Sequence, residues 1–131
     1  MKTVLFICVG NAGRSQMAEA FFNHLAKGKA TAISAGTNPA HSLIFNVVEA
    51  MREVDIDISN NKPKALTPEM IDQASLAVTM GCSAEAACPA SWVETRDWRL
   101  EDPEGQPIDK VKKIRDEIKA RVIDLLKELE G

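Results

Sequence analysis

The chain has 131 residues, of which 45% are hydrophobic and 27% are charged, and its formal net charge is −3. These values are typical of a globular domain large enough to bury a core, so we expect a single domain over residues 1–131. Without an excess of basic residues, neither nucleic acid nor an acidic membrane surface is an expected partner.

Cysteine usage and hydrophobicity indicate a cytoplasmic protein. An odd number of cysteines, three, argues against a secreted domain built on disulfides and favours a reducing compartment that keeps the thiols reactive. The longest apolar run, residues 4–9, is too short to cross a bilayer, and Met1-Lys2 leads into it without a cleavable signal segment. We therefore expect a cytoplasmic protein without membrane contact, and we expect it to be a monomer.

The N-terminal half of the chain predicts strands and helices in alternation. An apolar run with β-branched residues over 3–9 predicts a strand buried on both faces, followed by a turn over 10–13. From Arg14 to Gly28, apolar residues recur at helical spacing and predict the first helix. Residues 31–35 predict a second strand. The second helix is marked by Leu43, Val47, Met51 and Val54.

The C-terminal half predicts a short helix, two further strands and a long helix. Thr67-Pro68 is a typical helix start, with a capping hydroxyl and a proline in the first turn. Apolar residues over 76–80 and 93–98 predict the third and fourth strands. Pro107 opens the last helix. Its apolar side consists of Ile108, Val111, Ile114, Ile118, Val122, Leu125 and Leu129.

This alternation predicts an α/β fold, a single doubly wound domain with a four-stranded parallel sheet flanked by helices. In such folds, ligands bind at the carboxyl ends of the strands. The turn that starts with Cys8 follows the first strand, so we expect the functional site there.

The segment from Cys8 to Ser15, CVGNAGRS, has the features of an oxyanion site. A glycine-containing turn at a helix N-terminus directs backbone N–H groups and the helix dipole toward an anion. The planar guanidinium of Arg14 matches a tetrahedral oxyanion, and these positive surroundings favour a nucleophilic thiolate at Cys8, to which Ser15 would donate a hydrogen bond. The N–H groups of the cradle belong to Val9, Gly10, Asn11, Ala12, Gly13 and Arg14.

The loop has two other interpretations. The spacing differs from that of the glycine-rich loops that bind ATP and NAD, so neither nucleotide is an expected ligand. A cysteine at a strand end is also commonly no more than a small buried hydrophobe. Arg14, the glycines and the helix start together favour the oxyanion site.

The CxxxxxRS motif after the first strand resembles that of the low-molecular-weight protein tyrosine phosphatases. The longer string CVGNAGRSQMAEAF is similar to the thioredoxin-coupled arsenate reductases of that superfamily. The similarity continues in Ser34-Ala35-Gly36, Met80-Gly81-Cys82, Cys88-Pro89, Asp97-Trp98 and Leu100-Glu101-Asp102-Pro103. It implies the phosphatase-like fold and an enzyme that reduces arsenate to arsenite, with phosphate or sulfate as mimics of the substrate.

The resemblance also implies roles for three further residues. Asp102 matches the general acid that protonates the departing oxygen, although the sequence alone would indicate a solvated acidic turn. Cys82 matches the thiol that attacks the Cys8–arsenic adduct and releases arsenite, leaving a Cys8–Cys82 disulfide. Cys88 then attacks Cys82, and an external donor, usually thioredoxin in relatives, reduces the Cys82–Cys88 disulfide. Buried structural cysteines are the alternative, and relatives vary in the spacing of this pair.

Two other function classes stay open. A low-molecular-weight phosphatase acting on phosphotyrosine or another phosphomonoester would need only Cys8, because water completes its reaction. Phosphatases of this fold often carry an aromatic residue just after the Asp-Pro pair, whereas this chain has Glu104 there and no tyrosine anywhere. An acidic residue at the pocket mouth favours a small inorganic anion over an aryl phosphate. The third class is a non-catalytic oxyanion-binding or redox-sensing module.

No tightly bound cofactor is expected. In some relatives, positions matching Asn11, Glu19 and Ser34 hold a potassium ion, although a helix-surface glutamate and a strand serine are common without one. Asn11 also matches a residue that orients the cradle, and asparagine in a turn tolerates left-handed torsions as well. The cysteines, with His24 and His41, lack the paired spacing of a zinc site.

Overall fold

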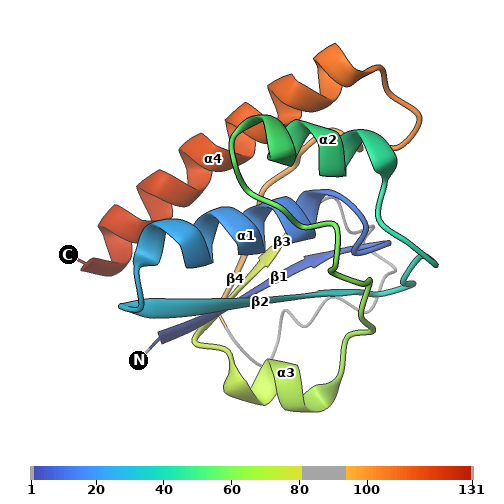
Figure 1. The fold of residues 1–131 in the computed structure, drawn as a ribbon. Coiled ribbons are helices and arrows are strands. Elements are labelled where there is room, and N and C mark those ends of the chain that lie inside the picture. Colours follow the sequence, from blue (N-terminus) through green and yellow to red (C-terminus); the bar gives the residue numbers. More distant parts are fainter. Residues whose placement is uncertain (1, 81–93, 131) are drawn as a thin grey trace.

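The computed structural model describes residues 2–80 and 94–130 (Figure 1). Strands and helices alternate as predicted from the sequence. The elements are β1 (Lys2–Cys8), α1 (Arg14–Ala26), β2 (Ala30–Gly36), α2 (Phe45–Glu53), α3 (Pro68–Gln73), β3 (Leu76–Thr79), β4 (Thr95–Asp97) and α4 (Ile108–Glu130). Within the described part of the chain, no helix is long and apolar enough to cross a membrane.

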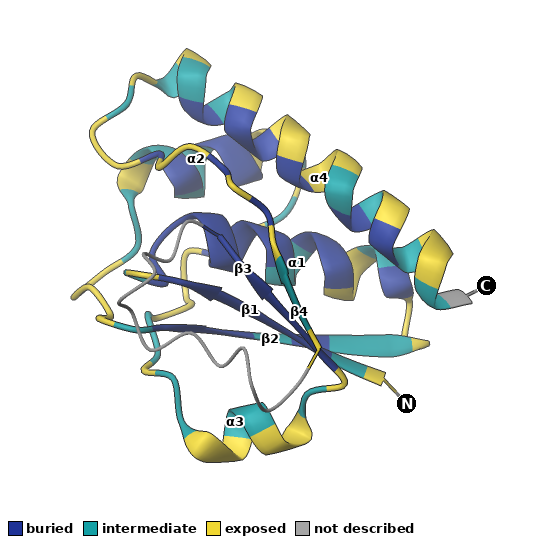
Figure 2. Ribbon diagram, turned by 180° about the vertical axis from the view of Figure 1, so that it is seen from behind, coloured by how far each residue is buried: buried dark blue, intermediate teal, exposed yellow. Residues whose placement is uncertain are grey.

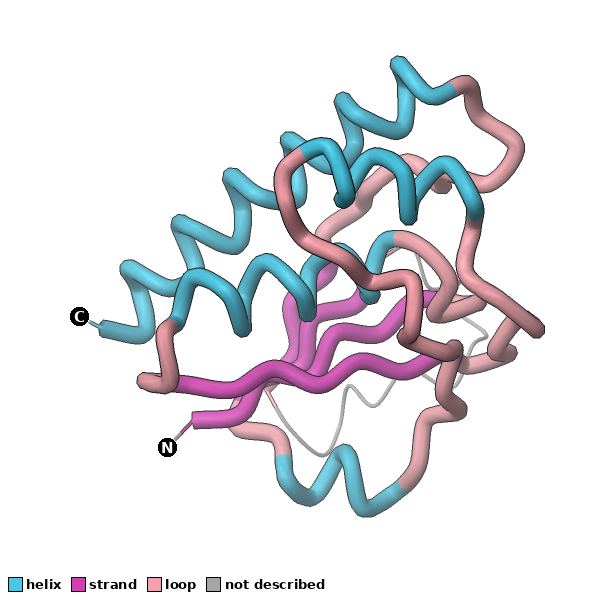
Figure 3. Tube along the Cα trace, in the orientation of Figure 1, coloured by secondary structure: helices cyan, strands magenta, loops and turns pink. Residues whose placement is uncertain are grey.

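The four strands form one parallel sheet in the order β2-β1-β3-β4. Helices α1, α2 and α4 cover one face and α3 covers the other, which confirms the predicted doubly wound α/β fold (Figure 1). In the sheet register, Cys8 pairs with Gly36, and Thr79 lies between Ile7 and Asp97. The carboxyl ends of all four strands therefore meet at one edge, where the loops after β1 and β2 gather (Figure 3).

Strand β1 supplies the centre of two apolar layers. Val4 and Phe6 face the larger layer beneath α1, α2 and α4, whereas Leu5 and Ile7 face the smaller layer toward α3. The ring of Phe6 meets that of Phe22 edge-on, with 6.0 Å between centroids. Burying a side chain of this size contributes about 1.5–3 kcal/mol. Figure 2 shows the result: the central strands β1 and β3 are largely buried, and the outer faces of the helices are exposed. This core fixes β1, and with it Cys8.

Three element boundaries are informative. The hydroxyl of Thr67 accepts a hydrogen bond from the N–H of Met70 (3.3 Å), which confirms the predicted start of α3. Helix α2 begins at Phe45 and not near Leu43, because Ile44 has an extended backbone and serves as the N-cap. Strand β4 forms one edge of the sheet and is shorter than predicted, and the first residue predicted for it, Val93, lies outside the described residues.

Candidate active site

The loop between β1 and α1 surrounds a buried cysteine. The side chain of Cys8 is 2% exposed, and its Sγ accepts a hydrogen bond from the N–H of Asn11 (3.2 Å). The hydroxyl of Ser15 lies 2.8 Å from the same sulfur. Gly13 caps α1 and has no side chain to accept from the first N–H groups of the helix. Those groups are therefore suited to bind an anion.

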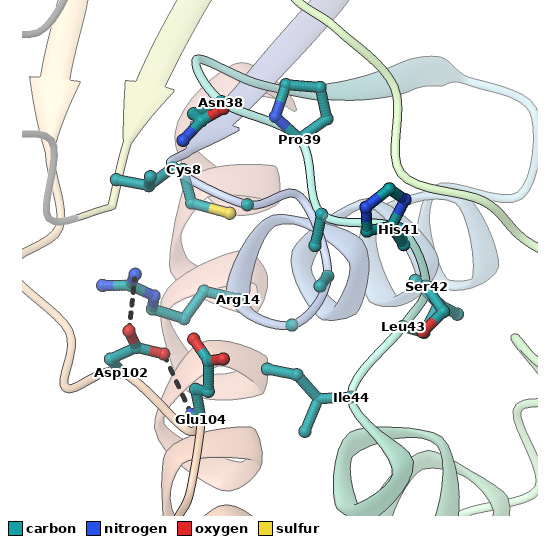
Figure 4. Close-up of a pocket in the computed structure, with 15 residues that line it drawn as sticks. Cys8, Arg14, Asn38, Pro39, His41, Ser42, Leu43, Ile44, Asp102 and Glu104 are labelled. Atoms are coloured by element: carbon teal, nitrogen blue, oxygen red, sulfur yellow. Dashed lines mark hydrogen bonds and ion pairs between the residues drawn. The ribbon is translucent and has the colours of Figure 1, made fainter.

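A cavity of about 620 Å³ opens onto Cys8 (Figure 4). Arg14 and Asp102 lie on one side of it, and the segment from Asn38 to Ile44 forms the opposite wall. The cavity also includes Val9, Gly10, Ala12, Gly13 and Glu104. The cavity thus combines a thiol, a guanidinium and a carboxyl group, which are suited to nucleophilic attack on a tetrahedral oxyanion, and a second carboxyl group from Glu104.

Arg14 links the loop to the segment that carries Asp102. Its side chain is 8% exposed and donates a hydrogen bond through Nη1 to the carbonyl of Leu100 (3.1 Å). Its Nη2 lies 3.8 Å from Oδ2 of Asp102, whose side chain is 57% exposed. The other oxygen of Asp102 accepts from the N–H of Glu104 (2.9 Å). Asp102 can therefore meet a bound anion and solvent at the same time, as a proton donor must.

Close packing fixes the distance between these two segments. A Cβ added at Gly13 would lie 2.8 Å from Cγ of Pro103 and 3.2 Å from Cδ1 of Ile44. Only glycine therefore lets the segment after Asp102 approach the cysteine loop this closely. The Asp-Pro pair predicted from the sequence as part of the site is brought to Cys8 by this contact.

A buried polar network lies behind the cysteine. Asn11 has a left-handed backbone (φ 51°), and its Nδ2 donates to the hydroxyls of Ser15 (2.7 Å) and Ser34 (3.0 Å). Its Oδ1 accepts from the N–H of Lys64 (2.8 Å) and from Nε2 of Gln16 (3.1 Å). The two interpretations of Asn11, a tolerant turn residue and an orienting residue, are thus both compatible with its position.

The same contacts bear on the potassium site. Both hydrogen bonds to Oδ1 of Asn11 occupy the oxygen that an ion would need, and Ser34 accepts from the Asn11 amide. The carboxylate of Glu19 lies 3.8 Å from the ammonium of Lys64, a cation already in place. These residues fit a potassium ion poorly. The potassium site therefore stays a prediction, and these contacts do not favour it. Among the described residues, no cluster of His, Cys, Asp and Glu could hold a metal ion.

Sequence analysis did not identify Gln16 or residues 61–64. Gln16 is fully buried in the first turn of α1, and its only sequence signal is its place directly after the CxxxxxRS motif. Residues 61–64 contain no sequence motif that would mark them as part of the site. They reach it only through the tertiary structure. Cys82 and Cys88, predicted to complete the reaction, lie outside the described residues.

Comparison with known proteins assigns the family. The sequence profile of the low molecular weight phosphotyrosine protein phosphatases matches residues 3–131. A Bacillus cereus protein named arsenate reductase 1 is 39% identical over 123 residues, which cover 92% of this chain and 91% of that protein.

Two solved structures share the fold. A thioredoxin-dependent arsenate reductase of Corynebacterium glutamicum has a TM-score of 0.84 and 36% identity; the match covers 99% of this chain but 62% of that one. An arsenate reductase in its phosphate-binding state has a TM-score of 0.87 and 33% identity, with 98% of both chains covered. On this evidence and on the geometry of the Cys8 loop, the chain belongs to the low molecular weight phosphotyrosine protein phosphatase family.

Proposed function

We propose that the protein reduces arsenate to arsenite, using Cys8 as nucleophile and Cys82 with Cys88 as a disulfide relay that thioredoxin regenerates. The observation that carries the proposal is the buried thiol of Cys8, which lies among hydrogen-bond donors in a chain with two further cysteines. The proposal is supported by relatives at 33–39% identity that are named arsenate reductases, one of them thioredoxin-dependent.

In the first step, arsenate binds with its oxygens toward the N–H groups of the loop and the guanidinium of Arg14. The Cys8 thiolate attacks arsenic, so that an S–As bond forms and an As–O bond breaks. Asp102 gives its proton to the departing oxygen, which leaves as water. The position of Asp102, in the cavity wall and 3.8 Å from Nη2 of Arg14, supports this role.

In the second step, the thiol of Cys82 attacks the sulfur of Cys8, so that a Cys8–Cys82 disulfide forms and the thiol proton passes to an oxygen of the departing arsenite. The electron pair of the S–As bond stays on arsenic, which is reduced from As(V) to As(III) and leaves as arsenite. Cys88 then attacks Cys82, Cys8 leaves as a thiolate, and the two thiols of thioredoxin reduce the Cys82–Cys88 disulfide. Met80, two residues before Cys82 in the sequence, donates its N–H to the carbonyl of Ile7 (2.8 Å), so the described chain ends beside the strand that carries Cys8, and this supports the proposed role of Cys82.

The test is arsenate-dependent oxidation of NADPH, coupled through thioredoxin and thioredoxin reductase. We expect turnover in the wild type and none in Cys82→Ser or Cys88→Ser. A single-turnover measurement separates the two variants, because Cys88→Ser should release one arsenite per chain and Cys82→Ser none. Steady turnover in Cys82→Ser would overturn the relay.

A phosphatase is the second candidate, because the family includes phosphotyrosine phosphatases and because Asp102 lies in the same cavity as Cys8. Glu104 also lines this cavity, and its carboxylate disfavours an anionic aryl group at the mouth. Hydrolysis of p-nitrophenyl phosphate at equal rates in the wild type and Cys82→Ser, without arsenate reduction, would favour the phosphatase. Phosphate binding without any turnover would favour a non-catalytic module.

A further inference from the structure

We propose that Gln16 is a positioning residue for Cys8. Its side-chain amide joins residues 61–64 to Asn11 and so holds in place the start of a hydrogen-bond chain that ends on the Cys8 sulfur. The inference rests on the proposed function only in taking Cys8 as the nucleophile.

The direction of the chain follows from a backbone donor. The N–H of Lys64 can only donate, so the Asn11 atom that lies 2.8 Å from it is the carbonyl oxygen Oδ1. The amide nitrogen Nδ2 of Asn11 then faces Ser15 and donates to its hydroxyl oxygen (2.7 Å). Ser15 keeps its own hydrogen for Cys8 Sγ, 2.8 Å away. A hydrogen bond donated to sulfur stabilises the thiolate over the thiol.

Gln16 stabilises the start of this chain. Its Nε2 donates to Oδ1 of Asn11 (3.1 Å) and to the carbonyl of Lys62 (3.2 Å), while its Oε1 accepts from Nδ2 of Asn61 (3.3 Å). Because the two oxygens that face Nε2 cannot donate, the amide of Gln16 has a single satisfactory orientation. One fully buried amide thus connects helix α1, the cysteine loop and residues 61–64.

The fold around residues 61–64 does not depend on Gln16 alone. The N–H of Gly36 donates to the carbonyl of Lys64 (2.7 Å), and the N–H of Leu66 donates to the carbonyl of Gly36 (3.0 Å). These two bonds tie the segment to the end of β2 as an isolated parallel bridge. Loss of the Gln16 amide should therefore disturb the hydrogen bonds behind Cys8 more than it disturbs the fold.

The test measures how fast iodoacetamide alkylates Cys8 across a range of pH, in a Cys82→Ser, Cys88→Ser background in which Cys8 is the one cysteine of the chain. Gln16→Met keeps the side-chain length but removes both donated hydrogen bonds. We expect alkylation near neutral pH to slow about three- to tenfold, with the midpoint of the pH–rate curve moved to higher pH. A loosened loop alone would change the plateau rate and leave the midpoint in place.

A second variant tests whether Gln16 must donate, and not accept, the hydrogen bond with Asn11. Gln16→Glu preserves the shape but turns an acceptor toward Oδ1 of Asn11 and the carbonyl of Lys62, so it should move the midpoint further than Gln16→Met. Asn23→Ala is the matched control, since Asn23 also makes two hydrogen bonds from α1, both to the backbone of Ala32 (3.0 and 2.8 Å). It should lower the melting temperature and leave the alkylation curve unchanged.

One result would overturn the proposal. If Gln16→Met melts at a lower temperature but alkylates with the pH midpoint of the unsubstituted protein, Gln16 is a packing residue with no influence on Cys8. Because alkylation needs no arsenate, a failure here leaves arsenate reduction standing. A failure of arsenate reduction likewise leaves this inference standing.

Discussion

The two segments that face each other across the cavity are built differently. Cys8, Asn11 and Ser15 are buried, and hydrogen bonds connect all three. Across from them, Asp102 is more than half exposed and contacts the cysteine loop through the Arg14 guanidinium. The hydrogen-bond donors on the anion-binding side are thus preorganised, and electrostatic catalysis depends mainly on such fixed donors. The proton-donating side, in contrast, needs access to solvent. Substitutions on the first side should therefore affect fold and activity together, and those on the second side activity alone.

The strongest test of the buried side is Cys8→Ser. A hydroxyl is far less nucleophilic than a thiolate and cannot form a disulfide, so arsenate reduction should fall by at least about 10⁴-fold. The coupled NADPH assay measures this. Phosphate should still raise the melting temperature, because the donors of the loop remain. Residual turnover in Cys8→Ser would show that another group carries the reaction.

Arg14 connects the two sides, and Arg14→Lys should have the next largest effect. Lysine keeps the charge but loses the planar fork, which donates to the carbonyl of Leu100 and which the proposed mechanism uses to bind the anion. We expect kcat/KM for arsenate to fall roughly 10²–10³-fold, the cost of removing an oxyanion donor. Arg99→Lys is the control, since Arg99 is 90% exposed and pairs with Asp97. Equal activities in the two variants would exclude a special role for the guanidinium of Arg14.

Asp102→Asn tests the exposed side. Asparagine cannot supply the proton, so kcat should fall about 10²-fold, at the lower end of general acid catalysis. The urea unfolding free energy should change by less than about 0.5 kcal/mol, because the side chain is largely exposed. Glu101→Gln is the matched control, in which a neighbouring acid paired with Lys110 (2.8 Å) is neutralised. If both variants lose the same activity, the segment acts through its charge and not through a proton.

Gly36→Ala should destabilise the buried side by crowding the cysteine loop. The added Cβ would lie 2.6 Å from the carbonyl oxygen of Val9 and 3.1 Å from Cβ of Asn11, so the cysteine loop must move. Overpacking of this kind costs about 1–3 kcal/mol of unfolding free energy, which urea denaturation measures. Gly10→Ala is the stability control, since its Cβ would meet no atom closer than 3.8 Å. Equal stability of the two variants would show that the loop is less rigid than its contacts suggest.

Much of the fold could be predicted because the sequence encodes it locally. The buried strand β1 is a continuous apolar run, and α4 shows its apolar face at regular spacing. The boundary of α2 was missed because Ile44 is apolar but has an extended backbone at the cavity wall. The spacing of apolar residues shows which positions are buried. It does not distinguish an apolar residue inside a helix from one just outside the helix that packs against another segment.

The site could be predicted only where its residues are close in sequence. Cys8, Arg14 and Ser15 lie within one segment of eight residues, and the CxxxxxRS motif contains all three. Gln16 contacts the carbonyl of Lys62, 46 residues away, and a bond of that kind leaves no local pattern. The placement of Asp102 likewise depends on the fit of Pro103 against Gly13, which only the folded chain reveals.

The smallest expected effect lies away from both segments, between α2 and α4. The carboxylate of Glu53 binds Lys112 (2.6 Å) and Arg115 (2.7 Å). These hydrogen bonds lower the pKa of Glu53, and the bond with Lys112 has the larger effect. A carboxyl group whose folded pKa is lowered stabilises the protein above its unfolded pKa, and that stabilisation is lost as the pH falls through the folded value. Glu53→Gln should therefore be slightly less stable than the wild type near neutral pH, and the difference should shrink as the pH falls below the ordinary pKa of glutamate and through the lower folded value.

Urea unfolding at several pH values measures this difference, and added salt should shrink it, because the side chains of Glu53 and Lys112 are partly exposed. Arsenate reduction by Glu53→Gln should match the wild type, since no described contact joins Glu53 to the Cys8 loop or to Asp102. A difference in stability that persists in acid would mean that Glu53 acts through packing. A loss of activity at neutral pH would mean that the α2–α4 contact influences the wall of the cavity, which α2 adjoins at Ile44.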